Sequence, residues 1–315
     1  MRRTLLFTLA FCTVQHAETV VRLVPDWQVK LNLGSGVLYA AVCPDGSVYA
    51  VSRSGEVNLV SRQGEAGGSW GRGIFRIVDA VACASDGKLY VTGRNSSGAM
   101  DSLAIVSNTG RFYRSPRVTD LGVRITSIAV LDRDNIAVAG DRTGSSFPLH
   151  LMSRTGRLIR SFGEGDGAGT VDPELTNGFL LWSEHRRQLF FVPRHLPEVQ
   201  IYASDGTPVA VRGFGTNRPA AAQFGQQGSL DEIRGAAILP TGHILVQASV
   251  RSLMLLSPDV SGEHFEMWTD LGLLAGSDRY GGIYFVERDR IGRAHVQSHL
   301  KPPSQHGDKP GRAVI

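Results

Sequence analysis

One short pattern recurs down the chain: an alternating apolar run that ends in a glycine-containing turn. Five such runs are EVNLV, DSLAI, PLHLM, EVQIY and SLMLL, and the turn glycines that follow them are Gly64, Gly110, Gly156, Gly206 and Gly262. A second set of six segments lies upstream of these turns: PDGSVYAVS (44–52), SDGKLYVTG (85–93), DRDNIAVAG (132–140), HRRQLFFVP (185–193), PTGHILVQA (240–248) and RYGGIYFVE (279–287). Strict alternation between turns indicates strands, and a repeat of this period predicts one supersecondary unit copied along the chain.

Each unit reads as four short strands. A run of small and apolar residues precedes each member of the second set, for example LYAAV before PDGSVYAVS. Two alternating runs and a more variable fourth strand follow. The turns carry Asp-Gly, Thr-Gly and Asn-Thr-Gly, which supply the positive φ angles that tight hairpins require. Four-stranded units at this spacing are the blades of a β-propeller, so we predict an all-β, six-bladed β-propeller of four-stranded blades.

The sixth blade, residues 271–300, has no fourth strand of its own. The segment DWQVKLNLG (26–34) precedes the first blade and has no place in it. We predict that residues 27–33 pair as the outer strand of blade 6 and close the ring, which protects two exposed sheet edges. The propeller then spans residues 18–300. Residues 301–315 are rich in Pro and Gly, and we expect a disordered tail.

The N-terminus has the composition of an export signal. Arg2 and Arg3 precede an apolar run at residues 5–14 that is too short to span a bilayer. We expect residues 1–17 to be a signal peptide cleaved after Ala17, and the protein to be exported, either periplasmic or secreted. A lipoprotein-like box at residues 9–12 and a twin-arginine signal are the alternatives. No later segment is apolar and long enough to be a transmembrane segment.

Cleavage there leaves two cysteines, Cys43 and Cys83. Export permits a disulfide. The repeat, however, aligns both at matching positions on the inner strands of neighbouring blades. We estimate that matching positions lie roughly 8–10 Å apart, whereas a disulfide needs Cα atoms within about 7 Å. We therefore expect two buried thiols.

The chain carries a formal net charge of +4, with a sequence pI of about 9.1. Nearly all of its basic residues are Arg, and a GC-rich genome would explain that excess as well as an anionic partner would. The basic residues are scattered, with no run of five or six, so we expect no nucleic-acid partner.

Two segments, residues 160–193 and 212–246, resemble the NHL-type repeat. Each has a Phe-Gly strand end, a glycine-rich loop and then an inner strand with its hairpin. The chain therefore resembles a divergent bacterial six-bladed propeller of the NHL-repeat or TolB-like group. It departs from the pattern because Arg or Ser replaces, in most blades, the Asp that usually ends the second strand. The resemblance implies the fold only, because the group includes protein-binding, RNA-binding and enzymatic members.

Three motifs suggest chemistry but fit the blade pattern better. The glycine-rich stretch 163–169 has no helix behind it to cradle a phosphate, and we interpret it as a loop between blades. Ser69 lies in a G-x-S-x-G match, but at an outer strand instead of a strand-to-helix turn. His295 and His299 lie on a predicted strand, about 13 Å apart. We predict no catalytic residue, no metal ligand and no cofactor.

One layer of residues opens onto the channel at the start of the inner strands: Tyr39, Asp79, Thr126, Phe179, Arg234 and Leu274. Asn177 and Glu232 lie just outside it. A single carboxylate is too few for a hard cation, which prefers several oxygen ligands. Asp79 and Arg234 belong to opposite blades, so we expect them to face each other across the channel. They would either orient a small ligand or form a structural pair.

The hairpin after the second strand carries an arginine at the same offset in four blades: Arg53, Arg94, Arg194 and Arg288. Asp141 and Ser249 hold this position in the other two blades. These hairpins lie on one face of a propeller, where guanidinium groups bind carboxylates or phosphates in bidentate fashion. Random placement in an Arg-rich chain would give the same pattern. We predict an exported, monomeric binding module that recognises a protein or a small anionic ligand on this face. The alternative is a metal-dependent, lactonase-like hydrolase or lyase with its site in the central channel.

Overall fold

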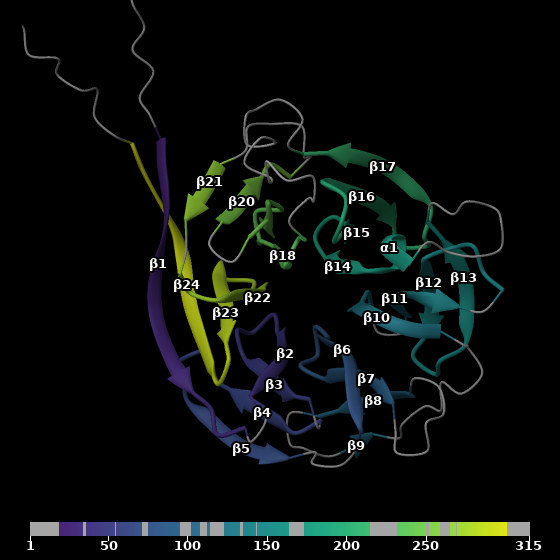
Figure 1. Ribbon diagram of the computed structural model, residues 1–315, viewed down its shortest axis with the longest axis horizontal. Coiled ribbons are helices and arrows are strands. Elements are labelled where there is room, and N and C mark those ends of the chain that lie inside the picture. The colour runs from purple at the N-terminus through teal and green to yellow at the C-terminus, as the bar shows by residue number, and fades with distance from the viewer. Residues whose placement is uncertain are drawn as a thin grey trace, which may run out of the picture.

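The computed structural model describes residues 19–33, 36–53, 55–70, 75–94, 102–107, 112–113, 123–132, 135–142, 144–163, 173–214, 232–249, 252–258, 265–268 and 270–300. These residues form six separate four-stranded sheets arranged around a central axis (Figure 1). The predicted six-bladed β-propeller is confirmed.

The blades follow one another along the chain. Blade 1 contains β2 (Val37–Val42), β3 (Val48–Ser52), β4 (Val57–Val60) and β5 (Ala66–Trp70); blade 2 contains β6 (Ile77–Cys83), β7 (Leu89–Arg94), β8 (Ser102–Val106) and β9 (Phe112–Tyr113); blade 3 contains β10 (Val123–Val130), β11 (Asn135–Arg142), β12 (Leu149–Ser153) and β13 (Leu158–Phe162). Blade 4 contains β14 (Gly178–Ser183), β15 (Gln188–Pro193), β16 (Glu198–Ala203) and β17 (Pro208–Gly213), preceded by the short α1 (Pro173–Thr176); blade 5 contains β18 (Gly235–Ile238), β19 (Ile244–Gln247), β20 (Ser252–Leu256) and β21 (Phe265–Trp268). Blade 6 contains β22 (Leu273–Ser277), β23 (Gly282–Glu287), β24 (Arg290–Leu300) and β1 (Thr19–Lys30).

The hydrophobic core lies between the blades, because each sheet stands with its two faces toward its two neighbours. Alternation in β3 shows this directly. Tyr49 and Val51 pack in a cluster with residues of blade 2, whereas Val48 and Ala50 pack in a cluster with residues of blade 6. All of β3, the second strand of blade 1, is buried, which is why this strand is apolar on both faces.

Tyrosines tie neighbouring blades together near their turns. The Tyr49 hydroxyl donates a hydrogen bond to the Gly87 carbonyl of blade 2 at 2.9 Å, and the Tyr284 hydroxyl donates to the Gly46 carbonyl of blade 1 at 2.9 Å. Gly46 has a φ of +88°, and a Cβ there would lie 2.8 Å from the Arg62 side chain. The Asp-Gly turns therefore serve both the hairpin and the contact between blades.

The ring is closed by the N-terminal strand, as predicted. β1 pairs antiparallel with β24, from Thr19 opposite Leu300 to Lys30 opposite Arg290. The strand is longer than the predicted segment and begins earlier. Trp27 Nε1 donates to the Arg62 carbonyl of blade 1 at 3.0 Å, so the closing strand also contacts the next blade.

A polar network sits on this closing pair of strands. Asp26 is the extra residue of a β-bulge in β1, and its carboxylate contacts Arg293 Nη1 and His295 Nδ1, each at 2.7 Å. Arg293 Nη2 also lies 3.7 Å from the fully buried carboxylate of Asp278. His295 therefore has a structural partner on the closing strand.

The prediction of two free thiols is wrong: Cys43 and Cys83 form a disulfide, with Cα atoms 5.1 Å apart. The two cysteines do not occupy matching positions. Cys43 N–H donates to the Ser47 carbonyl, and the equivalent bond in blade 2 joins Ala84 to Lys88, one residue beyond Cys83. Because neighbouring residues in a strand point to opposite faces, this offset turns both sulfur atoms toward the interface between blades 1 and 2.

Candidate functional site

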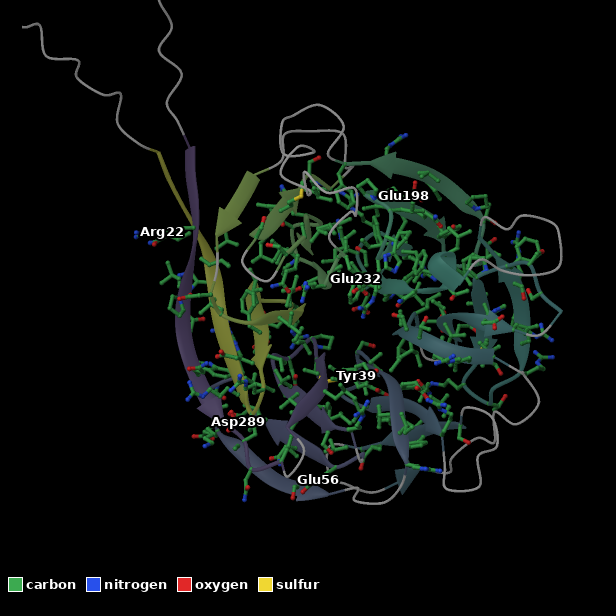
Figure 2. The ribbon with its side chains drawn as sticks, in the orientation of Figure 1. Arg22, Tyr39, Glu56, Glu198, Glu232 and Asp289 are labelled. Carbon is green, nitrogen blue, oxygen red and sulfur yellow. A yellow bond between two sulfur atoms is a disulfide. The ribbon has the colours of Figure 1, made fainter. Side chains whose placement is uncertain are left out.

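The arginine mouth is the end of the channel where the inner strands begin and the second strands end. It contains Tyr39, Asp79, Phe179, Glu232, Arg234 and the four arginines Arg53, Arg94, Arg194 and Arg288. Three of these arginines directly follow β3, β15 and β23, and Arg94 ends β7, so antiparallel pairing brings them to one face. Tyr39 and Glu232 lie on opposite sides of the central axis (Figure 2).

Asp79 pairs with the arginine of its own blade. Arg94 Nη2 lies 3.4 Å from Asp79 Oδ1, and the Asp79 side chain is only 15% exposed. Asp79 is the extra residue of a bulge in β6, and such bulges re-aim side chains. The structure joins Asp79 to Arg94, not to Arg234, the partner that we expected across the channel.

Arg194 of blade 4 reaches the start of blade 5. Its Nη1 donates to Glu232 Oε1 at 2.8 Å, and its guanidinium lies 4.9 Å from the centre of the Phe179 ring. The hydrogen bond from Arg194 is the main cause that lowers the pKa of Glu232, while partial burial opposes it. Arg194 is thus held by a carboxylate and an aromatic ring, which fixes its position at the mouth.

Charged residues of three blades affect the pKa of Tyr39. Burial raises the pKa of its hydroxyl, and the negative charge of Asp79 raises it further, whereas Arg194 and Arg53 lower it. Arg194 belongs to blade 4, which stands opposite blade 1. The charge of Arg194 therefore acts on a hydroxyl of the opposite blade. Because its pKa is raised, the Tyr39 hydroxyl stays neutral at pH 7 and can donate a hydrogen bond.

In blade 1 the residue equivalent to Asp79 is Leu38, one position before Tyr39, which we expected there. Leu38 is the unpaired bulge residue of β2, the position that Asp79 holds in β6. Tyr39 instead pairs opposite Val51, as Ala80 pairs opposite Thr92. Leu38 is 45% exposed, so blade 1 presents an apolar side chain where blade 2 presents Asp79.

Three arginines of the mouth form no salt bridge among the described residues: Arg53, Arg234 and Arg288. Arg234 nevertheless helps to lower the pKa of Glu232, after the larger effect of Arg194. All three arginines are exposed. Arg124, which the sequence analysis did not single out, is also exposed at the start of β10. The position of Arg124 at the start of an inner strand could have indicated a mouth residue, but a single arginine in an Arg-rich chain does not stand out.

The other motifs lie where the blade pattern puts them. Ser69 is in the outer strand β5, and His295 and His299 are in β24. Residues 164–169 of the glycine-rich stretch lie outside the described residues. Across the part of the chain that the structure describes, no three His, Cys, Asp or Glu side chains gather so as to hold a metal ion.

No protein-family model and no curated protein sequence matches the chain. Its fold is similar to solved structures. One is virginiamycin B lyase from Staphylococcus aureus, with a TM-score of 0.56 and 11% identity, covering 88% of this chain and 99% of that one. Another is a streptogramin B lyase, with a TM-score of 0.52 and 12% identity, covering 86% and 98%. No helix within the described ranges is long and apolar enough to cross a membrane. The chain is a six-bladed β-propeller. These matches concern the fold, and they are consistent with the resemblance to the NHL-repeat or TolB-like group.

Proposed function

We propose that this propeller is an exported, monomeric binding module whose arginine mouth recognises a carboxylate or another small anionic group, either free or on a partner protein. The observation that carries the proposal is the gathering of arginines from several blades at one end of the channel, because each follows or ends the second strand of its blade. Arg53 of blade 1 and Arg194 of the opposite blade 4 both lower the pKa of the Tyr39 hydroxyl. A ligand seated there meets a neutral hydroxyl donor and guanidinium groups from opposite blades.

The charge balance of the mouth favours an anion. The five arginines of the mouth outnumber its three carboxylates, because blade 3 carries the exposed Asp141 at the arginine position. The exposed arginines Arg53, Arg234 and Arg288 keep their guanidinium groups available for bidentate contacts. Leu38 and Leu273, at the starts of β2 and β22, are 45% and 43% exposed. The ligand that fits this surface carries an anionic group beside an apolar part.

Export is supported by the disulfide between Cys43 and Cys83. Such bonds persist in oxidising compartments and are rare in the cytosol. The disulfide and the signal-like composition of residues 1–17 are independent observations, and both support export.

The enzyme alternative has no comparable support. The similar structures are described as lyases, but at 11–12% identity the likeness concerns the fold. A metal-dependent hydrolase or lyase needs converging ligands, and the described residues contain no such group.

The test compares two charge-matched variants. In the first, Arg53, Arg94, Arg194 and Arg288 become Gln. In the second, four arginines away from the mouth become Gln: Arg22, Arg157, Arg187 and Arg212. Isothermal titration with acetate, succinate, citrate and phosphate at low ionic strength measures binding to each variant and to the wild type.

We expect the wild type and the second variant to bind at least one of these anions equally, and the mouth variant to lose at least tenfold in affinity. Equal affinity of all three proteins would refute the assignment of this face. A lack of binding by the wild type to every anion would refute a site for small anions.

A further inference from the structure

The central channel contains a cavity that lies away from the arginine mouth. Its volume is 590 Å³, within the range of about 300–1,000 Å³ typical of small-molecule sites. All six inner strands, β2, β6, β10, β14, β18 and β22, contribute to its wall. Every blade therefore contributes to this site.

The cavity reaches the face opposite the arginine mouth, which we call the turn face. Its lining continues to residues of the first hairpin turns, including Pro44, Asp132 and Arg279. Tyr39 and Phe179, at the other end of the inner strands, do not line it. A ligand would therefore enter between the hairpin turns, and the two sites can be tested separately.

The wall is made largely of strand edges. Each inner strand is the last strand of its sheet and forms a ladder only with the second strand of its blade. Its inward N–H and C=O groups face the axis, and buried backbone groups need hydrogen-bond partners. Side chains serve some of them: Ser127 Oγ accepts from Leu180 N–H at 3.0 Å, and Ser277 Oγ donates to the Ile238 carbonyl at 2.5 Å.

Away from the turns, the wall is uncharged and combines alanines with larger aliphatic residues such as Ile128, Val130 and Leu181. Ala40, Ala82, Ala129 and Ala275 line the cavity and leave it open, and Trp182 adds a half-buried aromatic ring. Charged lining residues occur only at the turn end. An ion inside the channel would lose its hydration with no opposite charge beside it, whereas an uncharged ligand with both donors and acceptors matches the strand edges.

We propose that the channel pocket binds a small, uncharged, polyhydroxylated molecule of the neutral sugar class. Its hydroxyl groups pair with the inward backbone groups of the inner strands. The indole of Trp182 offers an apolar ring face together with one N–H donor. This site does not depend on the function proposed for the arginine mouth.

The experiment uses the full mature chain and defined sugars. Ligand-observed saturation-transfer NMR and tryptophan fluorescence are recorded with glucose, maltose and N-acetylglucosamine, and with glucuronate and glucosamine as charged counterparts. We expect at least one neutral sugar to bind with a Kd of about 1 mM or tighter and to change the fluorescence. The charged counterparts should bind at least tenfold more weakly.

Two variants locate the site. Ala82→Phe, which adds bulk at a residue of the cavity wall, should weaken sugar binding at least tenfold. Trp182→Phe should lose the fluorescence response while keeping the fold, so it remains informative if Ala82→Phe does not fold. The variant lacking the four mouth arginines should bind sugar like the wild type.

Three results would overturn the proposal. One is the absence of binding of every neutral sugar by the wild type at about 10 mM, well above the expected Kd. The second is equal binding of neutral and charged sugars. The third is a folded Ala82→Phe protein, or a Trp182→Phe protein with the full fluorescence change, that behaves like the wild type.

Discussion

At the scale of single residues, acidic side chains partly neutralise the positive charge of the arginine mouth. Asp79 holds Arg94, and Glu232 holds Arg194. These pairs orient the guanidinium groups but also neutralise them. The anion affinity of the mouth should therefore depend on the two carboxylates as well as on the arginines.

Replacing Asp79 with Asn and Glu232 with Gln should raise anion affinity about fivefold, because a partly exposed ion pair such as that of Arg194 with Glu232 contributes up to about 1 kcal/mol. Titration with the tightest-binding anion of the panel measures this change. Glu198→Gln, a substitution on an outer strand pair, is the matched control. Weaker binding by the double variant would contradict this expectation. It would show that the carboxylates strengthen anion binding by orienting the guanidinium groups more than they weaken it by neutralising them.

His150 is the buried titratable residue most sensitive to pH. It is fully buried in β12, its Nδ1 shares a hydrogen bond with Ser161 Oγ at 2.9 Å, and burial, assisted by Arg142, lowers its pKa to about 4. In the unfolded chain a histidine titrates near pH 6.5, so the unfolded state binds the proton more tightly. Stability from this residue is therefore complete above about pH 6.5 and falls as the pH drops toward 4.

We expect the free energy of unfolding to fall by about 1.6 kcal/mol from this residue between pH 6.5 and pH 5, because the slope approaches 1.36 kcal/mol for each pH unit only below the pKa of the unfolded chain. Urea denaturation at the two pH values measures it. His150→Gln should remove most of this dependence, and the exposed His185→Gln should not. An unchanged pH dependence in His150→Gln would assign the effect to other groups.

At the scale of elements, alternation and turn glycines were sufficient to predict the blades, because period-two burial and positive φ leave direct marks in the sequence. Register was not predictable to the residue. The bulges at Leu38 and Asp79 leave each of these residues without a partner in the ladder. The sequences LYAAV and VDAVA contain no feature that predicts these bulges. The channel layer was therefore misaligned in blade 1, and the disulfide was missed because the two cysteines were aligned as equivalents.

The disulfide joins the inner strands of blades 1 and 2 across a sequence separation of 40 residues. Closing a loop of that size should stabilise the fold by about 4 kcal/mol through the entropy of the unfolded chain. Urea denaturation of the wild type with and without dithiothreitol measures this difference. The Cys43→Ser/Cys83→Ser variant should match the reduced wild type and should not respond to dithiothreitol. A stability that reduction leaves unchanged would contradict this role.

The closing strand β1 forms the longest pairing in the ring, with β24. Deleting residues 18–34 should expose the edge of β24, and also remove the contacts of Trp27 with Arg62 of blade 1 and with Tyr284 of blade 6. We expect a lower melting temperature and aggregation, seen by calorimetry and by light scattering after size exclusion. A control lacking residues 301–315 should melt like the full chain, and an unchanged melting temperature in the first deletion would refute closure by β1.

At the scale of the whole molecule, the ring gives the two ends of its channel different chemistry. One end gathers arginines from the second-strand hairpins around Tyr39. The other end opens between the hairpin turns, which carry charged residues, into a pocket whose deeper wall is uncharged. The sequence predicted the arginine face from a shared offset, but its ion pairs depend on contacts within and between blades that no linear pattern records, such as that of Arg194 with Glu232.

The most direct test of the anion-binding mouth is a crystal structure of the mature wild-type protein grown with citrate. We predict citrate density at the mouth, with carboxylate oxygens on Arg53 or Arg194 and a hydrogen bond from the Tyr39 hydroxyl, at distances below about 3.2 Å. An empty mouth in crystals where citrate occupies other arginines would contradict the account.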